Sequence, residues 1–593
     1  MNTPQRGPRR QMRRRSNYDK APFVAVGPAQ ECAAGWDSIT SWLAGASAIC
    51  VECYPGTNVE EVEAELAKRL QPAAIFRAAD AYKPVRAIQA MLAPHLSEDR
   101  VFGRMNGLSI EDWFDGAALG RMRSEVQDAA TRAKVLVIGA GASLMRPRQS
   151  VLVYADMARW EIQQRFRRAE AGNLGCANRH AEFSEKYKCG FFAEWRAADR
   201  LKKKTLPEAE FLLDTNDASS PKMIRGASFR AALRKVAGRP FRVVPYFDPG
   251  PWGGHWMEEV CDLPGDVPNY AWCFDCVPEE NSLLLGYGEH RVEIPSIDLV
   301  FLHPHELLGE AVHARFGAEF PIRFDFLDTM GGGNLSLQVH PLTEYIQDKF
   351  GMNYTQDESY YLLDAEPGAV VYLGLKDGID PKAMASALRS TESGEAMFPA
   401  EQYVNRFPVR AHDHYLIPAG TIHCSGKGSM VLEISATPYI FTFKLWDWGR
   451  LGMDGQPRPI HIEHGLANIQ WDRTTEWARR NLVNRITSAG SGDGWREEKT
   501  GLHEREFIET RRHWFTGTVP HDTRGGVNVL NLVQGEEAVI ESPAGTFDSY
   551  VIHYAETFIV PASVGRYTIR PYGAAVGTEC ATIKAYVRTE PFE

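Results

Sequence analysis

The chain has 593 residues, of which 44% are hydrophobic and 24% charged, and its formal net charge at pH 7 is −10. This length is too great for a single hydrophobic core, and the composition is typical of a globular protein and not of a disordered chain. The negative charge argues against nucleic acid or an anionic membrane as a partner, and no apolar run indicates a transmembrane helix. We therefore expect a multidomain protein in the cytoplasm.

Residues 1–22 form an arginine-rich segment, and no apolar stretch of signal-peptide length follows it. Such a basic run without an apolar segment is typical of a disordered tail and not of an export signal. We interpret residues 1–22 as a disordered basic tail.

From residue 23 to residue 238, apolar strand-like runs such as AKVLVIGAGASL alternate with helical patterns such as NVEEVEAELAKRL. This alternation predicts a parallel α/β domain. The layout resembles a nucleoside- or nucleotide-kinase domain that has lost its phosphate loop. VIGAGAS lacks the third glycine of the dinucleotide fingerprint, and CYPGTNVEE lacks the lysine of a phosphate loop. We expect no kinase activity and a role as a scaffold or weak ligand binder.

Two pairs of cysteines have the C-x-x-C spacing that zinc sites use, namely Cys50 with Cys53 and Cys273 with Cys276. The chain has only ten cysteines, which is too few for a disulfide framework at this length. The first pair lies in an apolar strand-like run, which favours buried, reduced thiols. We therefore expect no four-cysteine zinc site.

From residue 239 to residue 593, short strands of alternating apolar and polar residues are separated by Gly, Pro and Asp turns, as in AVVYLGL and HYLIPAGTIH. This pattern predicts an all-β barrel or sandwich. One helical insert is expected around PKAMASALRS.

The segment NLSLQVHP, residues 334–341, places Gln338 and His340 two positions apart in a strand-like run that ends at Pro341. Side chains two apart on a strand point to the same face, so these two can converge on one ion or one substrate. A hydrogen-bonded pair on a strand face has the same spacing. The two residues alone therefore do not define a metal site.

Two further side chains complete a candidate ligand set. Glu358 follows His340 by 18 positions, and His423 lies in the turn-forming stretch IPAGTIH. A small barrel brings strand starts, strand ends and turns to one mouth. One Gln, two His and one Glu suit Zn²⁺ and leave positions open for water or a sugar oxygen, although another divalent metal would also fit.

These motifs resemble the type I phosphomannose isomerases of the cupin class. The matching stretches also include PWGGHWM, FPIRFDFLD, VLEI, LWDWGR and FIVPASVGRYTI. The resemblance covers about residues 240–590, and the combination of QVHP with GTIH is its most specific part. It implies a double-cupin fold of jelly-roll barrels and one zinc ion per chain, with the ligands Gln338, His340, Glu358 and His423.

The resemblance also implies a reaction. In that family the metal and neighbouring polar groups move a proton between C1 and C2 of a sugar phosphate through an enediol, so that an aldose becomes a ketose. It implies Glu433 and Lys444 as catalytic residues and Ser336 and Arg450 as substrate-binding residues. For Glu433, a role limited to orienting ligands or pairing with Arg450 is an equal alternative. Lys444 can also point outward from its strand as a solvated residue.

Three positions depart from the family pattern. Asp325 and Gln356 stand where lysines are common, and Lys444 stands where an arginine is expected. Arg323 falls on the same strand face as Asp325, where the two can pair. Because a phosphate dianion needs several cationic donors, these departures leave the substrate open.

Three functions are therefore compatible with the sequence. The first is isomerisation of mannose 6-phosphate and fructose 6-phosphate, and the second is isomerisation of an unphosphorylated or differently charged sugar. The third is a non-catalytic sugar or sugar-phosphate sensor. Retention of all four metal ligands favours an isomerase with a small-molecule partner. The remaining histidines of this half, His461, His464 and His503, lie in polar turns and are expected to be solvated.

Overall fold

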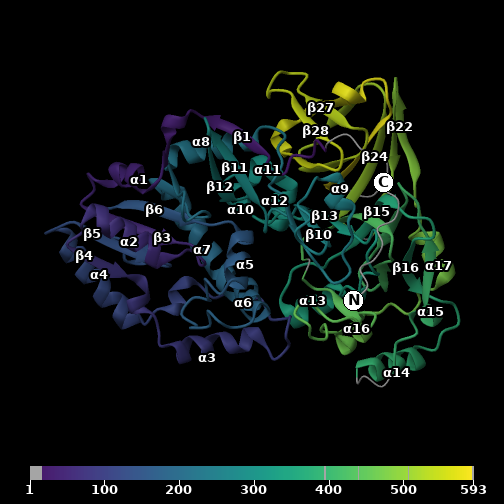
Figure 1. Cartoon of the computed structure of the whole chain (residues 1–593), viewed down its shortest axis with the longest axis horizontal. Coiled ribbons are helices and arrows are strands. Elements are labelled where there is room, and N and C mark those ends of the chain that lie inside the picture. The colour runs from purple at the N-terminus through teal and green to yellow at the C-terminus, as the bar shows by residue number, and fades with distance from the viewer. Residues whose placement is uncertain (1–15, 393–395, 439, 505, 590–593) are drawn as a thin grey trace.

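The computed structural model describes residues 16–392, 396–438, 440–504 and 506–589 (Figure 1). Residues 1–15 of the predicted basic tail lie outside this range. In the purple and blue N-terminal part, helices surround a sheet, whereas strands dominate the green and yellow C-terminal part (Figure 1). The architecture thus changes along the chain as the sequence pattern does.

The N-terminal part is built around a seven-stranded sheet. Its strands, in spatial order, are β2 (Cys32–Ala34), β8 (Lys222–Arg225), β7 (Phe211–Asp214), β6 (Val151–Asp156), β3 (Ala48–Cys53), β5 (Val135–Gly139) and β4 (Ala74–Arg77). The five strands from β7 to β4 are parallel, and β8 is antiparallel to both of its neighbours. Strands β3 and β5 are buried over their full length, as expected where both faces of a parallel sheet are covered.

Helices α1 to α8 belong to this part of the chain. They are α1 (Trp36–Leu43), α2 (Val59–Leu70), α3 (Val85–Leu96), α4 (Gly116–Ala130), α5 (Arg159–Arg167), α6 (Phe183–Cys189), α7 (Trp195–Thr205) and α8 (Gly226–Ala237). Helix α2 shows why they form: Asn58 caps it by accepting the backbone N–H of Glu61, and its last turn carries Lys68 and Arg69. A π-helical turn, Gly190–Glu194, joins α6 to α7.

The N-terminal end of the described chain lies against the C-terminal part. Strand β1 (Phe23–Gly27) pairs in parallel with β11 (Ser282–Tyr287), which pairs with β12 (His290–Pro295). We expected the tail to extend to residue 22, and this boundary is wrong. Tyr18 is only 6% exposed, and its hydroxyl donates to Asp275 over 2.6 Å. The division into domains at residue 238 stays a prediction.

The C-terminal part contains four larger antiparallel sheets in two pairs. The first pair consists of β18-β15-β20-β13-β10-β9 and β17-β16-β19-β14-β21, and the second of β22-β23-β24-β31-β26-β29 and β25-β30-β27-β28. In the second pair, residues of both sheets, such as Leu530 and Ile569, share one buried cluster. The sheets therefore pack face to face. That each pair is a cupin barrel stays a prediction.

The strands of the first pair are β9 (Tyr246–Asp248), β10 (Trp272–Cys276), β13 (Ile322–Asp328), β14 (Leu337–Val339), β15 (Glu358–Ala365), β16 (Val370–Leu375), β17 (Val404–Pro408), β18 (His414–Ile417), β19 (His423–Ser425), β20 (Ser429–Ala436) and β21 (Phe443–Trp446). Those of the second pair are β22 (Thr487–Gly492), β23 (Trp495–Lys499), β24 (Ile508–Phe515), β25 (Val519–Asp522), β26 (Asn528–Gln534), β27 (Glu537–Glu541), β28 (Tyr550–His553), β29 (Thr557–Val560), β30 (Arg566–Pro571) and β31 (Cys580–Val587).

Helices connect and cover these sheets. They are α9 (Trp256–Val260), α10 (Ile297–Leu302), α11 (Pro304–Leu308), α12 (Glu310–Phe316), α13 (Thr343–Phe350), α14 (Pro381–Glu392), α15 (Ala400–Tyr403), α16 (Ile462–Asn468) and α17 (Thr475–Asn481). The predicted helical insert is confirmed as α14. No helix in the described ranges is long and apolar enough to cross a membrane.

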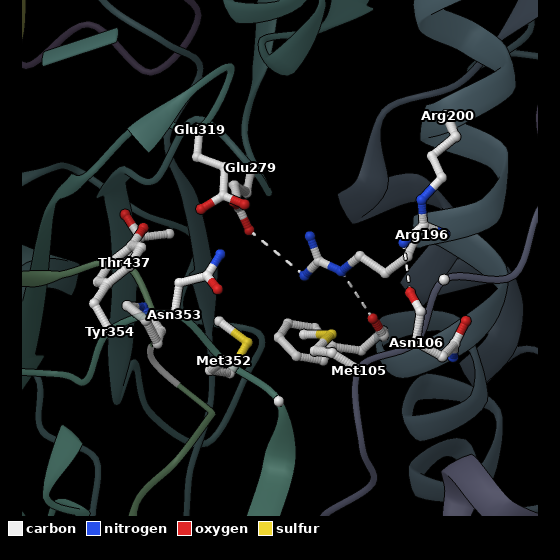
Figure 2. Close-up of a pocket in the computed structure, with 14 residues that line it drawn as sticks. Met105, Asn106, Arg196, Arg200, Glu279, Glu319, Met352, Asn353, Tyr354 and Thr437 are labelled. Atoms are coloured by element: carbon white, nitrogen blue, oxygen red, sulfur yellow. Dashed lines mark hydrogen bonds and ion pairs between the residues drawn. The ribbon is translucent and has the colours of Figure 1, made fainter. Parts of the chain in front are cut away.

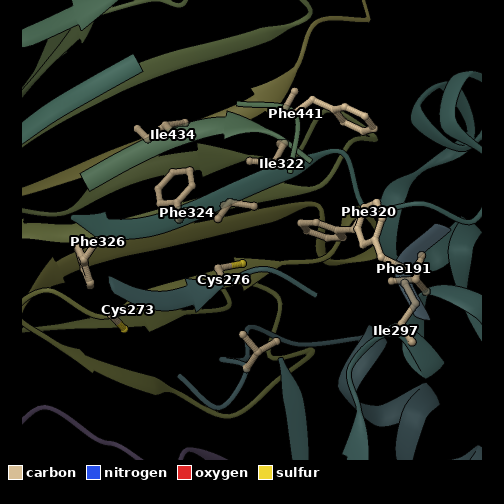
Figure 3. Close-up of a cluster of buried hydrophobic side chains, with 14 of the residues drawn as sticks. Phe191, Cys273, Cys276, Ile297, Phe320, Ile322, Phe324, Phe326, Ile434 and Phe441 are labelled. Carbon is tan, nitrogen blue, oxygen red and sulfur yellow. The ribbon is translucent and has the colours of Figure 1, made fainter. Parts of the chain in front are cut away.

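One hydrophobic core runs from the first pair of sheets into the N-terminal part (Figure 3). Phe324 and Phe326 of β13 and Ile434 of β20 lie at one end of the cluster in this view, and Phe320 and Phe191 lie at the other (Figure 3). Phe191 belongs to the π-helical turn of the N-terminal part. The two parts of the chain are therefore packed against each other at the end of the sheets where β13 begins.

Candidate metal centre

The predicted ligands come from three strands of the first pair of sheets. Gln338 of β14 is paired with His423 of β19 on one side and with Lys444 of β21 on the other. Directly paired residues of antiparallel strands project to the same face, so these three side chains share one face of the five-stranded sheet. Glu358 begins β15 of the six-stranded sheet. Strand β14 ends at Val339, just before Pro341, which has no backbone N–H for a ladder.

The structure brings the predicted ligands together. His340, Glu358 and His423 offer ligand atoms that all lie within 4.8 Å of one another. The Nε2 atoms of His423 and His340 lie 2.7 Å and 3.2 Å from the two carboxylate oxygens of Glu358. The Gln338 amide nitrogen lies 3.2 Å from His423 Nε2. All four side chains are buried, with at most 7% exposed.

The Nδ1 atom of each imidazole already has a hydrogen-bond partner. His340 Nδ1 lies 3.2 Å from the carbonyl oxygen of Phe441, and His423 Nδ1 lies 2.9 Å from that of Thr421. A carbonyl oxygen only accepts, so each Nδ1 carries a proton and each Nε2 faces the Glu358 carboxylate. This second contact is the usual way in which a metal-binding histidine is oriented.

The donor set fits a divalent cation. His340 Nε2 and Glu358 Oε1 are buried and have no hydrogen-bond donor among the described residues. Acceptor atoms at 2.7 Å repel each other unless a cation or a proton lies between them. Burial raises the pKa of Glu358, but the two adjacent imidazoles outweigh it and the net shift is downward. A carboxylate that stays ionised among nitrogen donors is suited to Zn²⁺.

A second group of buried polar side chains lies beside the ligands on the six-stranded sheet. Gln356 Nε2 donates to both Glu358 and Glu433, each over 3.2 Å, and so joins the metal centre to the candidate catalytic carboxyl. Arg323 lies 2.5 Å from Asp325 and 3.3 Å from Glu433. The suggested pairing of Arg323 with Asp325 is therefore present. Burial raises the pKa of Asp325 to about 7, although Arg323 acts in the opposite direction.

The alternative that Glu433 pairs with Arg450 is wrong. Glu433 pairs with Arg323, whereas Arg450 forms its ion pair with Asp447. Burial is the main cause that raises the pKa of Glu433 well above its usual range, and Asp325 adds to it. Glu433 is joined through Gln356 to Glu358, a candidate metal ligand, and this position is compatible with proton transfer and with orienting that ligand.

Lys444 lies on the site face of its strand. Its neighbours Phe443 and Leu445 are fully buried on the other face, whereas Lys444 is partly exposed and paired with Gln338. Ser336, which precedes Gln338 by two residues, donates to Asp447 over 3.1 Å. The outward position considered for Lys444 thus does not fit the register.

Sequence reasoning missed two residues near the site. Arg458 lies 2.9 Å from Asp447 and 3.4 Å from the Ser336 hydroxyl, but its loop has no periodicity that would reveal this. Tyr360 follows Glu358 by two residues on β15, and strand alternation would have placed it on the same face. Its buried hydroxyl has no hydrogen-bond partner among the described residues, and its ring meets that of His423 edge-on.

Other sequence-based expectations have different outcomes. All ten cysteines are buried and free, and the two C-x-x-C pairs lie in β3 and β10 of different sheets. The prediction that His461 is solvated is wrong, because it is only 7% exposed and its ring packs 4.6 Å from that of Phe102. That contact joins residues too far apart in sequence for a local pattern to reveal it.

The cavities outside the candidate metal centre include two with different linings. One of about 370 Å³ separates Arg196 and Arg200 of α7 from Glu279 and Glu319, which face them across the gap (Figure 2). Arg196 lies 3.8 Å from Glu279 (Figure 2). The other, of about 760 Å³, lies at the carboxyl ends of β3 and β5 around Gly56. No lysine is among the described residues that line it, and kinase inactivity stays a prediction.

Residues 35–238 match the model of a protein family described as a domain of unknown function, DUF8485. This stretch falls within the predicted α/β domain. It covers the seven-stranded sheet except for the edge strand β2.

Part of the chain is similar to mannose-6-phosphate isomerases. It is 26% identical over 218 residues to the mannose-6-phosphate isomerase of Streptococcus mutans, which covers 36% of this chain and 63% of the relative. It is 24% identical over 232 residues to ManA of Bacillus subtilis, covering 39% and 68% of the two chains. A probable mannose-6-phosphate isomerase of the same organism, GmuF, is 28% identical over 232 residues, with the same coverage. The chain thus spans about two thirds of the length of these relatives.

Solved structures of mannose 6-phosphate isomerases also align with this chain. That from Bacillus subtilis has a TM-score of 0.48 and 18% identity, and it covers 59% of this chain and 100% of its own. A zinc-bound mannose 6-phosphate isomerase has a TM-score of 0.45 and 14% identity with the same coverage.

Proposed function

We propose that the protein is a metal-dependent aldose–ketose isomerase of a sugar phosphate, with mannose 6-phosphate and fructose 6-phosphate as the substrate pair. The carrying observation is the buried Glu358 carboxylate, which lies between the Nε2 atoms of His340 and His423. Both imidazoles have their Nδ1 atoms at backbone carbonyls. The partial similarity to mannose-6-phosphate isomerases supports the same reaction. In this proposal the first pair of sheets belongs to a double-cupin fold.

The residues that would hold the metal ion are Gln338, His340, Glu358 and His423, and Zn²⁺ is the first candidate. When bound, such an ion polarises a sugar carbonyl and stabilises negative charge that develops on its oxygen. The protein contributes a dry, rigid setting, because the ligands are buried and Gln356 holds Glu358 from the side. Water that would compete with the sugar oxygens is thereby limited.

Glu433 carries the carbon-bound proton in this proposal. In its ionised form, which the Arg323 guanidinium favours, the Glu433 carboxylate would take the proton from C2 of the aldose and return it to C1 of the enediol, while a second proton moves from O2 to O1. The net change is one hydrogen from C2 to C1 and one from O2 to O1. Ser435 and Gln356 donate to the same oxygen of Glu433, over 3.0 Å and 3.2 Å, and so fix its orientation.

The phosphate end of the substrate would lie near Lys444, Arg450 and Arg458. Asp447 holds the two arginines together, and Ser336 lies within hydrogen-bond distance of both Asp447 and Arg458. Several cationic donors around one point are what a phosphate dianion requires. Arg458 adds a cation to this group, and this favours a phosphorylated substrate.

The test is a coupled assay of metal-analysed wild type and Glu433→Gln against phosphorylated and free aldoses. We expect turnover of mannose 6-phosphate with exchange of the C2 hydrogen in ²H₂O. Glu433→Gln should lower kcat by about 10²- to 10⁴-fold, as expected for loss of a general base, with the metal content unchanged. The matched control is Glu366→Gln, which changes an exposed carboxylate just beyond the C-terminal end of β15.

The alternatives predict different results in the same assay. Turnover of only an unphosphorylated aldose would assign a different sugar. Saturable binding of mannose 6-phosphate without turnover or C2 exchange would assign a sensor and would overturn the isomerase proposal.

A further inference from the structure

A short segment of the N-terminal part, residues 97–102, reaches the C-terminal part beside the proposed substrate site. Phe102 is its anchor and is only 1% exposed. Its ring lies 5.3 Å from that of Phe443 and 5.4 Å from that of Phe350. Phe443 immediately precedes Lys444 on β21. The segment is therefore docked on the strand that carries the candidate cation.

The segment is held in a defined shape. The Asp99 carboxylate accepts the backbone N–H groups of Val101 and Phe102, over 2.6 Å and 2.7 Å. Lys188 of α6 donates to the Asp99 carbonyl over 2.5 Å. The Ser97 hydroxyl donates to the Phe102 carbonyl over 2.7 Å. Because these bonds fix the backbone on both sides of residue 100, the base of the Arg100 side chain is positioned before any ligand arrives.

Arg100 extends from this segment to the loop that carries the other cations. Its guanidinium lies 3.1 Å from the Asp454 carboxylate, and about half of each side chain is exposed. Asp454 lies between Arg450 and Arg458 in the chain, within the loop after β21. Arg100 thus bridges from the N-terminal part to the loop that holds both arginines of the proposed phosphate site.

Positive charge exceeds negative charge in this group. Four cations, Lys444, Arg450, Arg458 and Arg100, are gathered with two carboxylates, Asp447 and Asp454. Lys444 forms no ion pair within the described ranges. The charges of Arg458, Arg450 and Arg100 repel that of Lys444, and Asp447 opposes this repulsion. A bound anion would relieve this mutual repulsion.

We propose that the N-terminal part completes the anion-binding end of the isomerase site. Arg100 adds positive charge for the phosphate group of the substrate, and through Asp454 it holds the loop that carries Arg450 and Arg458. This inference rests on the proposed function for the identity of the substrate, but not for the binding of a phosphate group. It gives the fused N-terminal part a role in substrate recognition that requires no activity of its own.

The test is calorimetric titration of metal-loaded full-length protein with inorganic phosphate, mannose 6-phosphate and mannose. Arg100→Ala should raise the Kd of both phosphate-bearing ligands by about five- to tenfold, as expected for one partly exposed charge-assisted contact. The Kd of mannose should not change. Arg100→Lys should retain part of the affinity, and the difference from Arg100→Ala should shrink as ionic strength rises.

Arg104→Ala is the matched control. Arg104 also contacts the C-terminal part, through the carbonyl oxygen of Asp348, but it forms no contact with the cation group. It should leave all three Kd values unchanged. Melting temperatures of all variants report whether the docking of the segment is preserved.

The outcomes separate this inference from the proposed function. Equal phosphate affinity in wild type and Arg100→Ala, equal loss in Arg104→Ala, or no phosphate binding by the wild type would each overturn the inference. Phosphate binding that depends on Arg100 in a protein without isomerase activity would retain the inference and overturn the proposed function. Isomerase activity together with an unchanged affinity of Arg100→Ala for phosphate would retain the proposed function and overturn the inference.

Discussion

Buried charges serve different purposes in two regions of this molecule. Where α10 packs against the N-terminal part, the Lys202 ammonium lies 2.7 Å from Asp156 and 2.5 Å from Asp298, and all three side chains are almost fully buried. Each charge has an opposite charge of the protein beside it. In the candidate metal centre, by contrast, the Glu358 carboxylate faces the Nε2 atoms of His340 and His423. A buried carboxylate and two imidazole nitrogens that converge on one point form an arrangement that a cation can complete, whereas a carboxylate paired with a cation of the protein indicates structure.

The largest expected effect is loss of the metal. His423→Ala removes one of four ligands and should reduce bound metal from about one ion per chain to near zero, with loss of activity. His340→Ala should do the same. The metal content of purified protein, measured by inductively coupled plasma mass spectrometry, is the test.

The histidine control for this experiment is His255→Ala. His255 is half exposed and contacts only Glu258 among the carboxylates of the described chain, so its loss should leave the metal in place. Stoichiometric metal in both His340→Ala and His423→Ala would show that the cluster is only a hydrogen-bonded group.

The next largest effect is expected from removing Lys202, which pairs with two buried carboxylates. Lys202→Met leaves Asp156 and Asp298 buried without their shared cation, which should lower the free energy of unfolding by about 3 to 5 kcal/mol. Metal bound per folded chain should not change. Urea unfolding followed by tryptophan fluorescence measures this, with the exposed Lys204→Met as the control. A stability loss below about 1 kcal/mol would mean that the ion pairs are not needed to keep the carboxylates buried.

The convergence of the candidate metal ligands was predictable because each position follows a local rule. Alternation on a strand places Gln338 and His340 on one face, and turns at strand ends bring Glu358 and His423 to the same region. The parallel α/β pattern and the insert α14 were also readable, since both depend on residues that are neighbours in sequence.

The features of the fold and the site that were not predicted depend on contacts between residues far apart in the chain. Arg458 reaches Ser336 from an irregular loop, and Phe102 packs on residues that follow it by more than 200 positions. Tyr18 similarly docks on Asp275 and so ends the predicted tail early. Such contacts are set by tertiary packing and leave no periodic signal in the local sequence.

A third prediction uses a single buried carboxyl of the N-terminal part. Glu52 accepts the backbone N–H groups of Gly141 and Ser143, yet burial raises its pKa from 4.5 to about 7. Because the folded value lies above the unfolded one, this group destabilises the fold progressively as pH rises from 4.5 to 7. The pKa shift corresponds to a contribution of about 3 kcal/mol to the free energy of unfolding. This contribution is present at low pH and is lost above pH 7.

Glu52→Gln should remove this pH dependence. The difference in free energy of unfolding between wild type and Glu52→Gln should move by about 3 kcal/mol in favour of the variant between pH 5 and pH 8. The hydrogen bond that glutamine cannot accept from Ser143 costs the same at both pH values and cancels. A difference independent of pH would show that Glu52 does not change its protonation in the folded protein within this range.

The smallest effect concerns Lys444. Unlike Lys202, it has no carboxylate partner within the described ranges, and unlike Glu358, it is a candidate cation of the proposed substrate site. Its register opposite Gln338 places it on the site face, so Lys444→Ala should raise KM or lower kcat for mannose 6-phosphate without releasing the metal. The loss of one charge-assisted contact is about 1.5 to 3 kcal/mol, or about ten- to a hundredfold in kcat/KM. Lys444→Arg should retain activity, since a guanidinium offers more donors to phosphate than an ammonium. Kinetics of Lys444→Ala equal to those of wild type would mean that Arg450, Arg458 and Arg100 suffice for the anion, and that Lys444 only tolerates the charge around it.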